Sequence, residues 1–502
     1  MNDHASVTPE EPEAGNANNP LLEALGSYVP QSELPFRLVS DAMAGVDRAS
    51  LDEEKRDLLL PCIKHCFEPT RVSLKMAGTV QRMIRTGYAR RNPTVAVNRL
   101  RSNEILSLRN QRQKDVRWFS SFADAMMVMG CTGTGKSHAI QRVCSLMPQL
   151  CVHSPSTSAG WIRQIQIPYL IVPMPAHRGG LLFAILEALD RALADSSLAR
   201  SYASNRTWTL DKLVIEVGAL LVQFFVGVLV IEEIQPRNFS AAPHNGELML
   251  MLLRLLNFGI PIVLVGNPLG FEGVGDFSQD MRRLTAQETM HLMPFEESDP
   301  DWSKALAPAL WAHNVMPVET PFDAEICHEL WAASAGIPDF AARACERAQR
   351  LALDSNDPAV TASHLRRYRE NSSAYLLDRD LVEGFAQKDP YRLSRFLDVP
   401  WEQYGLLWGK FESGHLPVVD HATAVGWNAA DAQAFRTVHQ RVRVQHMSAK
   451  TASASKKQRN GAVRAKAAPD DLRSGSIDLL CSGLEELRRA ATSDGPREPT
   501  ET

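Results

Sequence analysis

The sequence Met126-Met127-Val128-Met129-Gly130-Cys131-Thr132-Gly133-Thr134-Gly135-Lys136-Ser137 joins an apolar run to the pattern G-x-x-x-x-G-K-S. The apolar run predicts a buried strand at Ala125 to Met129, and the residues from His138 to Leu146 predict a helix. A strand, a glycine-rich loop and a helix in this order are the setting of a phosphate-binding P-loop.

Each position of this loop has a chemical role in holding a nucleotide. Glycines let backbone N–H groups close around phosphates, the Lys136 ammonium reaches the β- and γ-phosphates, and the Ser137 hydroxyl ligates Mg²⁺ at a helix N-terminus. We therefore expect ATP and Mg²⁺ as cofactors. The predicted nucleotide-binding residues are Gly130, Cys131, Thr132, Gly133, Thr134, Gly135, Lys136 and Ser137.

Length, charge and cysteine usage limit the class of protein. A chain of 502 residues is expected to hold about two to four domains, and a net charge of −4 excludes a protein that coats nucleic acid with an overall basic surface. The 8 cysteines show no zinc-finger spacing and are scattered, as in proteins of a reducing cytosol. Cys62, His65 and Cys66 form a cluster, which without a fourth ligand nearby is interpreted as one face of an ordinary helix.

No segment is predicted to cross a membrane or to direct secretion. The longest apolar run, Leu213 to Ile231, is interrupted by Glu216 and Gln223, and Gly227 divides it into a helical and a strand-like part. Residues 1–30 lack an apolar core and are expected to be a disordered leader. These features favour a cytoplasmic protein.

Residues 31–120 are predicted to be a helical region that becomes increasingly basic. The positive face is either a solvated surface or a surface for phosphate contact or protein docking. Its basic residues are Arg82, Arg85, Arg90, Arg91, Arg99, Arg101, Arg109, Arg112, Lys114 and Arg117.

Residues 121–298 alternate between apolar runs and amphipathic segments, which predicts an α/β nucleotide-binding domain with a parallel sheet. Residues 152–167 are expected to be a long loop. The strands predicted after the P-loop are Tyr169 to Met174, Val228 to Ile231, Ile262 to Gly266 and a last strand in Leu284 to Met293. The predicted helices are Gly180 to Leu193, Leu210 to Phe224 and Gly246 to Asn257.

Two helical regions are predicted to follow. Residues 299–370 are expected to form a helical lid subdomain, with helices at Pro321 to Ala335, Asp339 to Leu353 and Thr361 to Arg369. Residues 371–447 are expected to be a further helical region. Its aromatic stripe is either core or a groove for a partner, and consists of Trp401, Tyr404, Trp408 and Phe411.

The last region, residues 448–502, is predicted to be a basic flexible tail that holds DNA weakly. The apolar residues between Ile477 and Leu487 predict a short amphipathic helix near its end. That helix either binds a partner or docks back on its own domain.

Polar residues at the ends of two predicted strands are the expected catalytic groups. Glu232 is placed near Mg²⁺, and Glu233 is placed where it can orient or deprotonate the attacking water. The first position is more often Asp, so Glu232 departs from the usual pattern. Asn267 follows the strand expected between the P-loop strand and the acidic strand, and is expected to hold the attacking water.

Arg282 and Arg283 follow about fifteen residues after Asn267. In oligomeric ATPases an arginine from one subunit completes the site of its neighbour and stabilises transition-state charge. We expect one of the two arginines to act in this way, and the sequence does not favour either. The alternative is a surface pair that balances Asp280.

This ordered set resembles the AAA+ superfamily, and within it the DNA-transposition regulators of the TnsC/TniB type. The resemblance extends over about residues 80–370. It is carried by Tyr88 to Pro93, Gly130 to Ser137, Glu232 to Gln235, Val265 to Pro268, Met281 to Arg283 and Ser334 to Asp339. Many AAA+ proteins have a sensor arginine where this chain has Gly336-Ile337-Pro338-Asp339, and Arg343 is the residue offered for that role.

The resemblance implies an AAA+ core with a helical lid that hydrolyses ATP to ADP and phosphate as a regulatory switch. It also implies a homo-oligomer, ring or filament, that assembles on double-stranded DNA without sequence preference and recruits or activates a transposase with a target-selection protein. The implied location is the bacterial cytoplasm, on the nucleoid when DNA is bound. The alternative is a helicase loader, an initiator or a signalling NTPase. Candidate DNA contacts are Arg163, His177 and Arg178.

Overall fold

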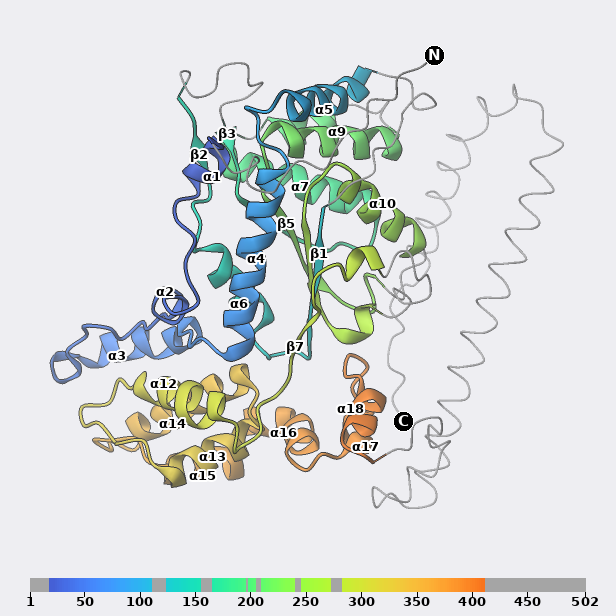
Figure 1. Ribbon diagram of the computed structural model, residues 1–502. Coiled ribbons are helices and arrows are strands. Elements are labelled where there is room, and N and C mark those ends of the chain that lie inside the picture. The colour runs from blue at the N-terminus through green and yellow to red at the C-terminus, as the bar shows by residue number, and fades with distance from the viewer. Residues whose placement is uncertain are drawn as a thin grey trace, which may run out of the picture. The chain divides into compact units, whose positions relative to one another are not determined.

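The computed structural model describes residues 18–110, 123–154, 165–195, 197–204, 209–239, 245–271 and 282–410, which belong to one compact unit. Its centre is a five-stranded parallel sheet with the strand order β4-β5-β6-β1-β7 (Figure 1). These strands are β1 (Ala125–Gly130), β4 (Tyr169–Pro173), β5 (Val228–Ile234), β6 (Ile262–Gly266) and β7 (Met290–Leu292). The predicted α/β fold with a parallel sheet is therefore confirmed.

The order of the strands places the three motif-bearing strands side by side. Strand β6 pairs with β1 on one side and with β5 on the other. The P-loop follows β1, the two glutamates end β5, and Asn267 follows β6. Because carboxyl ends of parallel strands lie at the same edge of a sheet, all three motifs reach one edge.

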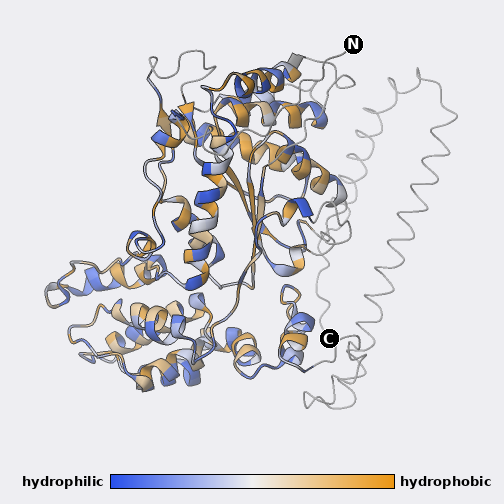
Figure 2. Cartoon of the chain, in the orientation of Figure 1, coloured by the Kyte–Doolittle hydropathy of each residue, from blue (hydrophilic) through white to orange (hydrophobic). Residues whose placement is uncertain are grey.

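The two faces of the sheet are covered by different helices, as the alternation of side chains along each strand requires. On one face, Met126, Val128 and Val263 pack against α4 and α6. On the other, Met127 and Leu264 pack against α7, α9 and α10. Figure 2 shows the strands of the sheet as mostly hydrophobic along their length, which is usual for a parallel sheet between two helical layers. These helices are α4 (Arg71–Ala89), α6 (Lys136–Cys144), α7 (Arg178–Leu193), α9 (Leu210–Gln223) and α10 (Asn245–Asn257).

The segment before α4 contains the helix α1 (Pro20–Ala24), so the prediction of a disordered leader over residues 1–30 is wrong for residues 18–30. Leu21 is fully buried and Leu25 nearly so, because α1 packs against α4. The other helices before β1 are α1 (Pro20–Ala24), α2 (Leu34–Leu38), α3 (Glu53–Leu59), the 3-10 helix η2 (Leu60–His65) and α5 (Ala96–Ser107). Helix α8 (Leu198–Ala203) follows α7.

A third core belongs to the helices after the sheet. The largest fully buried side chain of this part, Trp302, lies in it, and so does Tyr404 of the aromatic stripe, which confirms the interpretation of Tyr404 as core. Phe385 contacts the Tyr404 ring at 5.1 Å between centroids. The helices are η7 (Trp302–Leu306), α12 (Ala307–Ala312), α13 (Ala324–Ser334), α14 (Pro338–Asp354), α15 (Ala362–Asn371), α16 (Ser373–Ala386), α17 (Pro390–Leu393) and α18 (Trp401–Leu407).

Two sequence-based expectations about the sheet need correction. Of the segment Leu284 to Met293, only Met290–Leu292 forms a strand, paired with the end of β1. The expected loop at residues 152–167 is bounded by a short antiparallel pair, β2 (Cys151–Val152) with β3 (Ile165–Gln166). These strands are only two or three residues long and are defined by backbone hydrogen bonds to a neighbouring segment. The pattern of residue types along the chain therefore does not predict them.

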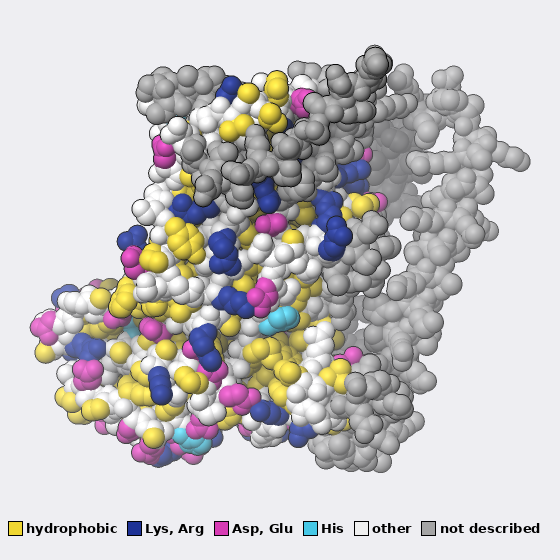
Figure 3. All heavy atoms as spheres, viewed as in Figure 1, with side chains coloured by type: hydrophobic (Ala, Val, Ile, Leu, Met, Phe, Trp, Pro, Cys, Tyr) yellow, Lys and Arg dark blue, Asp and Glu magenta, His cyan; other side chains and the backbone are white. Residues whose placement is uncertain are grey.

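Several arginines of the basic region are used inside the fold. Arg91 donates to the carbonyl of Val226 (2.8 Å), Arg99 to that of Pro93 (2.9 Å), and Arg109 forms an ion pair with Glu216. On the face drawn in Figure 3, Lys and Arg side chains are interspersed with acidic and apolar ones. The expected positive face therefore contains fewer exposed basic residues than the sequence suggested. Arg82 and Arg90 are among those that are exposed.

The candidate DNA contacts His177 and Arg178 have structural partners. The His177 ring accepts a hydrogen bond from the Gly180 N–H (2.9 Å), and Arg178 pairs with Glu247 (2.7 Å). Arg163, Phe411 and the tail at residues 448–502 lie outside the described residues. Within the described part, no helix has both the length and the apolar character that a membrane span requires.

Candidate nucleotide-binding and hydrolysis site

The P-loop has the backbone conformation that its glycines permit. Gly133 and Gly135 have φ of +81° and +82°, a region in which side chains are strained. A Cβ on Gly130 would lie 2.5 Å from the carbonyl oxygen of Leu292, so only glycine fits where β1 meets β7. Helix α6 begins at Lys136 directly after this loop, which places the N-terminal N–H groups of the helix at the loop.

Lys136 is oriented along the loop. Its Nζ donates to the carbonyl oxygen of Cys131 at 2.7 Å. Burial lowers the pKa of Lys136 to about 8, while Cys131 and the carboxylate of Asp398 oppose this shift. An ammonium that is poorly hydrated gains more from a phosphate than an exposed lysine does.

We expect ATP binding to weaken above pH 8. Lys136 is protonated below its pKa of about 8, and the phosphates require the charged form, so above that pH each binding event must also take up a proton. Between pH 7.5 and 9.0 the affinity should fall roughly eightfold by this linkage. Calorimetric titration across this range measures it. Lys136→Arg should bind with an affinity that is flat over the same range, because arginine stays protonated; an equal pH dependence in that variant would exclude Lys136 as the titrating group.

Glu232 lies next to the P-loop helix with an unused oxygen. Its side chain is 8 % exposed, and its Oε1 has no hydrogen-bond partner among the described residues. Burial raises its pKa, whereas hydrogen bonding by Gln141 and by the Ser137 hydroxyl opposes that rise. A buried carboxylate oxygen beside a serine hydroxyl fits a hard cation, so Ser137 and Glu232 are suited to hold Mg²⁺.

The backbone conformation directs the Glu233 side chain differently from that of Glu232. The register of β5 against β6 shifts between Ile231 and Ile234, and Glu233 has φ of +61°. A β-bulge of this kind redirects one side chain, and here it leaves Glu233 exposed beside the buried Glu232. Asn238 Nδ2 donates to the Glu233 carbonyl oxygen at 2.7 Å and holds this turn.

Asn267 is buried at the same edge. Its N–H donates to the carbonyl oxygen of Ile234 at 2.7 Å, which ties the end of β6 to the end of β5. Its side-chain Nδ2 donates to the backbone carbonyl of Asp398. The three polar positions predicted from the sequence are therefore brought to one edge of the sheet, with Asn267 engaged by a residue from the last helical region.

Sequence reasoning missed Asp398 and the role of Tyr404. Asp398 Oδ2 accepts a hydrogen bond from the Thr132 hydroxyl at 3.0 Å, and the Tyr404 hydroxyl lies 3.0 Å from the Cys131 sulfur. Both partners are P-loop residues. The helical spacing of the aromatic stripe indicated that Tyr404 is buried, but it contained no information about which segment Tyr404 packs against.

We expect Asp398→Asn to strengthen ATP binding about fivefold. The variant keeps an oxygen that accepts from Thr132 and removes a negative charge beside the loop that would hold phosphates, a repulsion of about 1 kcal/mol at this range. Titration with a fluorescent ATP analogue measures the change. Asp380→Asn is the control, because Asp380 pairs with Arg395 at an exposed site. Unchanged affinity in Asp398→Asn would show that its carboxylate does not act on the phosphates.

Arg282 and Arg283 differ in their surroundings. Arg283 is partly buried and donates to the Asn257 side-chain oxygen at 2.7 Å. Arg282 is exposed and has neither an ion pair nor a hydrogen bond with a described residue. Neither lines the cavity at the P-loop of its own chain.

A cavity of about 550 Å³ lies over the P-loop, a volume within the usual range for small-molecule sites. Lys136 and Ser137 line one side, and Phe67, Leu306 and Leu310 are among the apolar residues on the others. The cavity thus lies between the phosphate-binding loop and an apolar wall. This wall is made by the N-terminal segment (residues 18–70, before α4) and by the helices after the sheet. Such a wall suits a purine base.

The stretch Gly336 to Asp339 docks the lid on the P-loop. A Cβ on Gly336 would meet the Phe295 carbonyl oxygen at 2.0 Å, and the Asp339 N–H donates to the Gly133 carbonyl oxygen at 3.1 Å. Arg343, offered as a sensor, forms ion pairs with Asp339 (2.8 Å) and Asp378 (2.7 Å) and does not line the cavity. In this arrangement Arg343 stabilises the lid.

Comparison with known families gives the class of this domain. Residues 121–274, which contain β1, β5 and β6 with their motifs, match the AAA domain family. The predicted AAA+ core is confirmed at this level, because the match includes the three strands that carry the motifs. No curated protein matches the chain.

Solved structures that are similar to this chain include the following three. The Aeropyrum pernix ORC1 protein in complex with DNA is 16 % identical, with 65 % of this chain and 83 % of that chain covered and a TM-score of 0.35. The Thermotoga maritima RuvB Holliday junction branch migration motor is 16 % identical, with 66 % and 87 % covered and a TM-score of 0.31. Cdc6p from Pyrobaculum aerophilum is 13 % identical, with 62 % and 80 % covered and a TM-score of 0.33. Similarity at this level carries no functional argument.

Proposed function

We propose that this protein is an ATP-hydrolysing AAA+ regulator of DNA transposition, which assembles on double-stranded DNA and recruits or activates a transposase. The observation that carries the ATPase part is the meeting of the P-loop, the two glutamates and Asn267 at one edge of the sheet. The transposition part is supported by the sequence stretches that resemble TnsC/TniB regulators, of which Gly336 to Asp339 also docks the lid on the P-loop.

Different residues of the site would bind the phosphates, the Mg²⁺ ion and the adenine ring. Backbone N–H groups of residues 133–137 and the Lys136 ammonium would bind the phosphates. Ser137 and Glu232 would hold Mg²⁺, which when bound neutralises phosphate charge. The adenine ring fits against the apolar wall that includes Phe67 and Leu306.

Hydrolysis requires a base and a positioned water. Glu233, which the bulge presents to solvent rather than to the core, takes the proton from the attacking water. Asn267 orients that water through its side-chain amide, whose Nδ2 here donates to Asp398. This bond to the Asp398 backbone carbonyl uses one of the two Nδ2 hydrogens, so the other is left for the water.

Arg282 is the better candidate for the arginine that acts on the neighbouring subunit. We expect Arg282→Ala to lower the turnover of the assembled protein at least about 100-fold, because such an arginine stabilises transition-state charge. Arg283→Ala, which loses the bond to Asn257 inside its own subunit, should lower it less than about tenfold.

A mixing experiment separates action across the interface from damage to the fold. Arg282→Ala subunits keep Glu233, and Glu233→Gln subunits keep Arg282, so mixed oligomers contain complete sites where the two meet. Turnover of the mixture above that of either variant alone supports action in trans. If mixing gave no recovery although both variants assembled, Arg282 would not be the residue that crosses the interface.

Assembly on DNA tests the function as a whole. The wild-type protein is imaged and sedimented with ATP, a slowly hydrolysed analogue or ADP, each with and without duplex DNA. We expect rings or filaments on DNA with ATP or the analogue, with binding that is nearly independent of DNA sequence and falls steeply with salt. A protein that stays monomeric in all six conditions would contradict the proposal and favour a signalling NTPase. Assembly on DNA that does not stimulate a purified transposase would instead favour a loader or initiator.

A further inference from the structure

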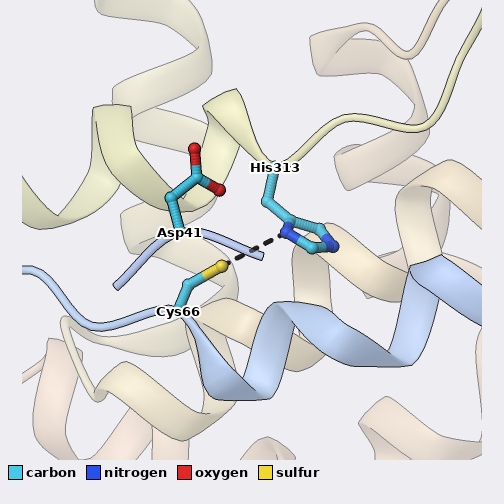
Figure 4. A group of neighbouring side chains, drawn as sticks. All are labelled: Asp41, Cys66 and His313. Atoms are coloured by element: carbon cyan, nitrogen blue, oxygen red, sulfur yellow. Dashed lines mark hydrogen bonds between the residues drawn. The ribbon is translucent and has the colours of Figure 1, made fainter. Parts of the chain in front are cut away.

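Three side chains that can ligate a metal meet at the junction of the N-terminal segment and the lid, next to the cavity over the P-loop, which Cys66 also lines. They are Asp41, Cys66 at the end of η2, and His313 at the end of α12 (Figure 4). One potential ligand atom from each lies within 4.8 Å of the others, and the Cys66 sulfur is 3.2 Å from His313 Nδ1. The interpretation of the Cys62 to Cys66 cluster as an ordinary helix face overlooked these ligands, because His313 is 247 residues away in sequence.

The tautomer of His313 leaves the correct nitrogen available. His313 Nε2 lies 3.1 Å from the backbone carbonyl oxygen of Leu59, which can only accept, so Nε2 carries the hydrogen. The Nδ1 lone pair is therefore directed toward Cys66. A ring nitrogen held by a carbonyl while the other faces the ligand cluster is the usual arrangement of a metal-binding histidine.

The backbone around the cluster is held on each side. Ser40 and Phe67 exchange two backbone hydrogen bonds of 2.9 and 2.8 Å, which fix the neighbouring residues Asp41 and Cys66 beside each other. The Asp41 Oδ1 accepts from the Met43 N–H at 2.8 Å, which orients the carboxylate.

The histidine side of the cluster is fixed as well. Gln349 donates to the carbonyl oxygen of His313, which is fully buried, at 2.8 Å. Arg48 of the N-terminal segment donates to the carbonyl oxygen of the adjacent Ala312 at 2.8 Å. The geometry of the three ligands is thus set by surrounding hydrogen bonds before any ion binds.

A catalytic cysteine site is the other reading of Cys, His and Asp together, and the hydrogen bonds disfavour it. In such a site the acid orients the histidine through the ring nitrogen opposite the cysteine. Here that nitrogen, Nε2, bonds to Leu59, and Asp41 lies on the same side as Cys66. All three groups converge on one point, as ligands do.

We propose that Asp41, Cys66 and His313 bind one Zn²⁺ ion that joins the N-terminal segment to the lid. One sulfur, one nitrogen and one oxygen are the donors that Zn²⁺ takes, and a water completes four-coordination. Binding replaces the Cys66 S–H bond by an S–Zn bond and releases the proton to solvent. Because Phe67 and Leu310 line the nucleotide cavity from the two joined segments, the ion would also fix that wall.

Metal titration of the full chain tests this site without reference to ATPase activity. The protein is treated with a chelator, desalted and titrated with Zn²⁺ against a chromophoric indicator, in the absence of nucleotide because ATP itself binds the metal. We expect one equivalent with a Kd of about 1 µM or lower. Co²⁺ substitution should give a sulfur-to-metal charge-transfer band and the intense visible absorption of a four-coordinate ion.

Variants show whether these three residues are the ligands. Cys66→Ser should lose the charge-transfer band and at least about 100-fold in affinity, and exposed Asp41→Asn, which should leave the fold unchanged, about tenfold. Cys151→Ser, a partly buried cysteine on β2 outside the cluster, should bind as the wild type does. A saturating excess of Zn²⁺ should raise the Tm of the wild type by about 3 °C and leave that of Cys66→Ser unchanged.

Three results would overturn the proposal. One is a Co²⁺ complex with no sulfur-to-metal band, and another is a band that persists in Cys66→Ser. The third is wild-type affinity in Asp41→Asn, which would reduce the cluster to a hydrogen-bonded Cys66–His313 pair.

Discussion

Lys136→Ala is expected to weaken ATP binding at least about 100-fold. The lysine is partly buried in the P-loop, whereas the other basic residues that line the cavity, Lys64, His65 and His138, lie outside the loop, so the phosphates lose the ammonium that the loop itself supplies. A 100-fold loss corresponds to about 2.7 kcal/mol, in the range of a charge-assisted contact in a desolvated site. Calorimetric titration with ATP and Mg²⁺ measures it.

A surface lysine supplies the control for this variant. Lys75 on α4 is about half exposed and pairs with Glu288, so Lys75→Ala removes the same charge without touching the loop. That variant should bind ATP as the wild type does. If both variants lost affinity equally, the effect would come from net charge, and the assignment of the P-loop as the phosphate site would be wrong.

Glu233→Gln is expected to bind ATP with wild-type affinity and to hydrolyse it about 100- to 1,000-fold more slowly. An amide cannot accept the proton of the attacking water, and general-base catalysis contributes factors of this size. Among the described residues, the exposed Glu233 side chain has no hydrogen bond or ion pair with the P-loop, so we expect ATP binding to stay unchanged. Phosphate release under single-turnover conditions measures the chemical step.

Glu232→Gln should give a different result from Glu233→Gln although the two residues are adjacent. Glu232 is buried beside Ser137, so its amide variant should weaken Mg²⁺ binding and raise the Mg²⁺ concentration needed for half-maximal activity. Glu247→Gln on α10 is the control for loss of a surface carboxylate. If Glu233→Gln kept the turnover of the wild type, Glu233 would not be the general base.

Much of the nucleotide site was predictable because its motifs are local in sequence. The P-loop needs its glycines and Lys136 within eight consecutive residues, and Glu233 and Asn267 each end an apolar strand. Strands that are connected through helices run parallel, so the meeting of their carboxyl ends, and of these motifs, at one edge was also predictable.

The sequence by itself therefore determined the α/β nucleotide-binding domain, most strands of its sheet and the candidate residues at their carboxyl ends. Tertiary structure alone decided which distant side chains reach them: Asp398 and Tyr404 at the P-loop, Asn257 at Arg283, and His313 at Cys66. The reason is physical. Periodicity and motif spacing report which face of an element is buried and what its end presents, whereas contacts between segments up to 273 residues apart depend on how helices pack, which the local pattern does not specify.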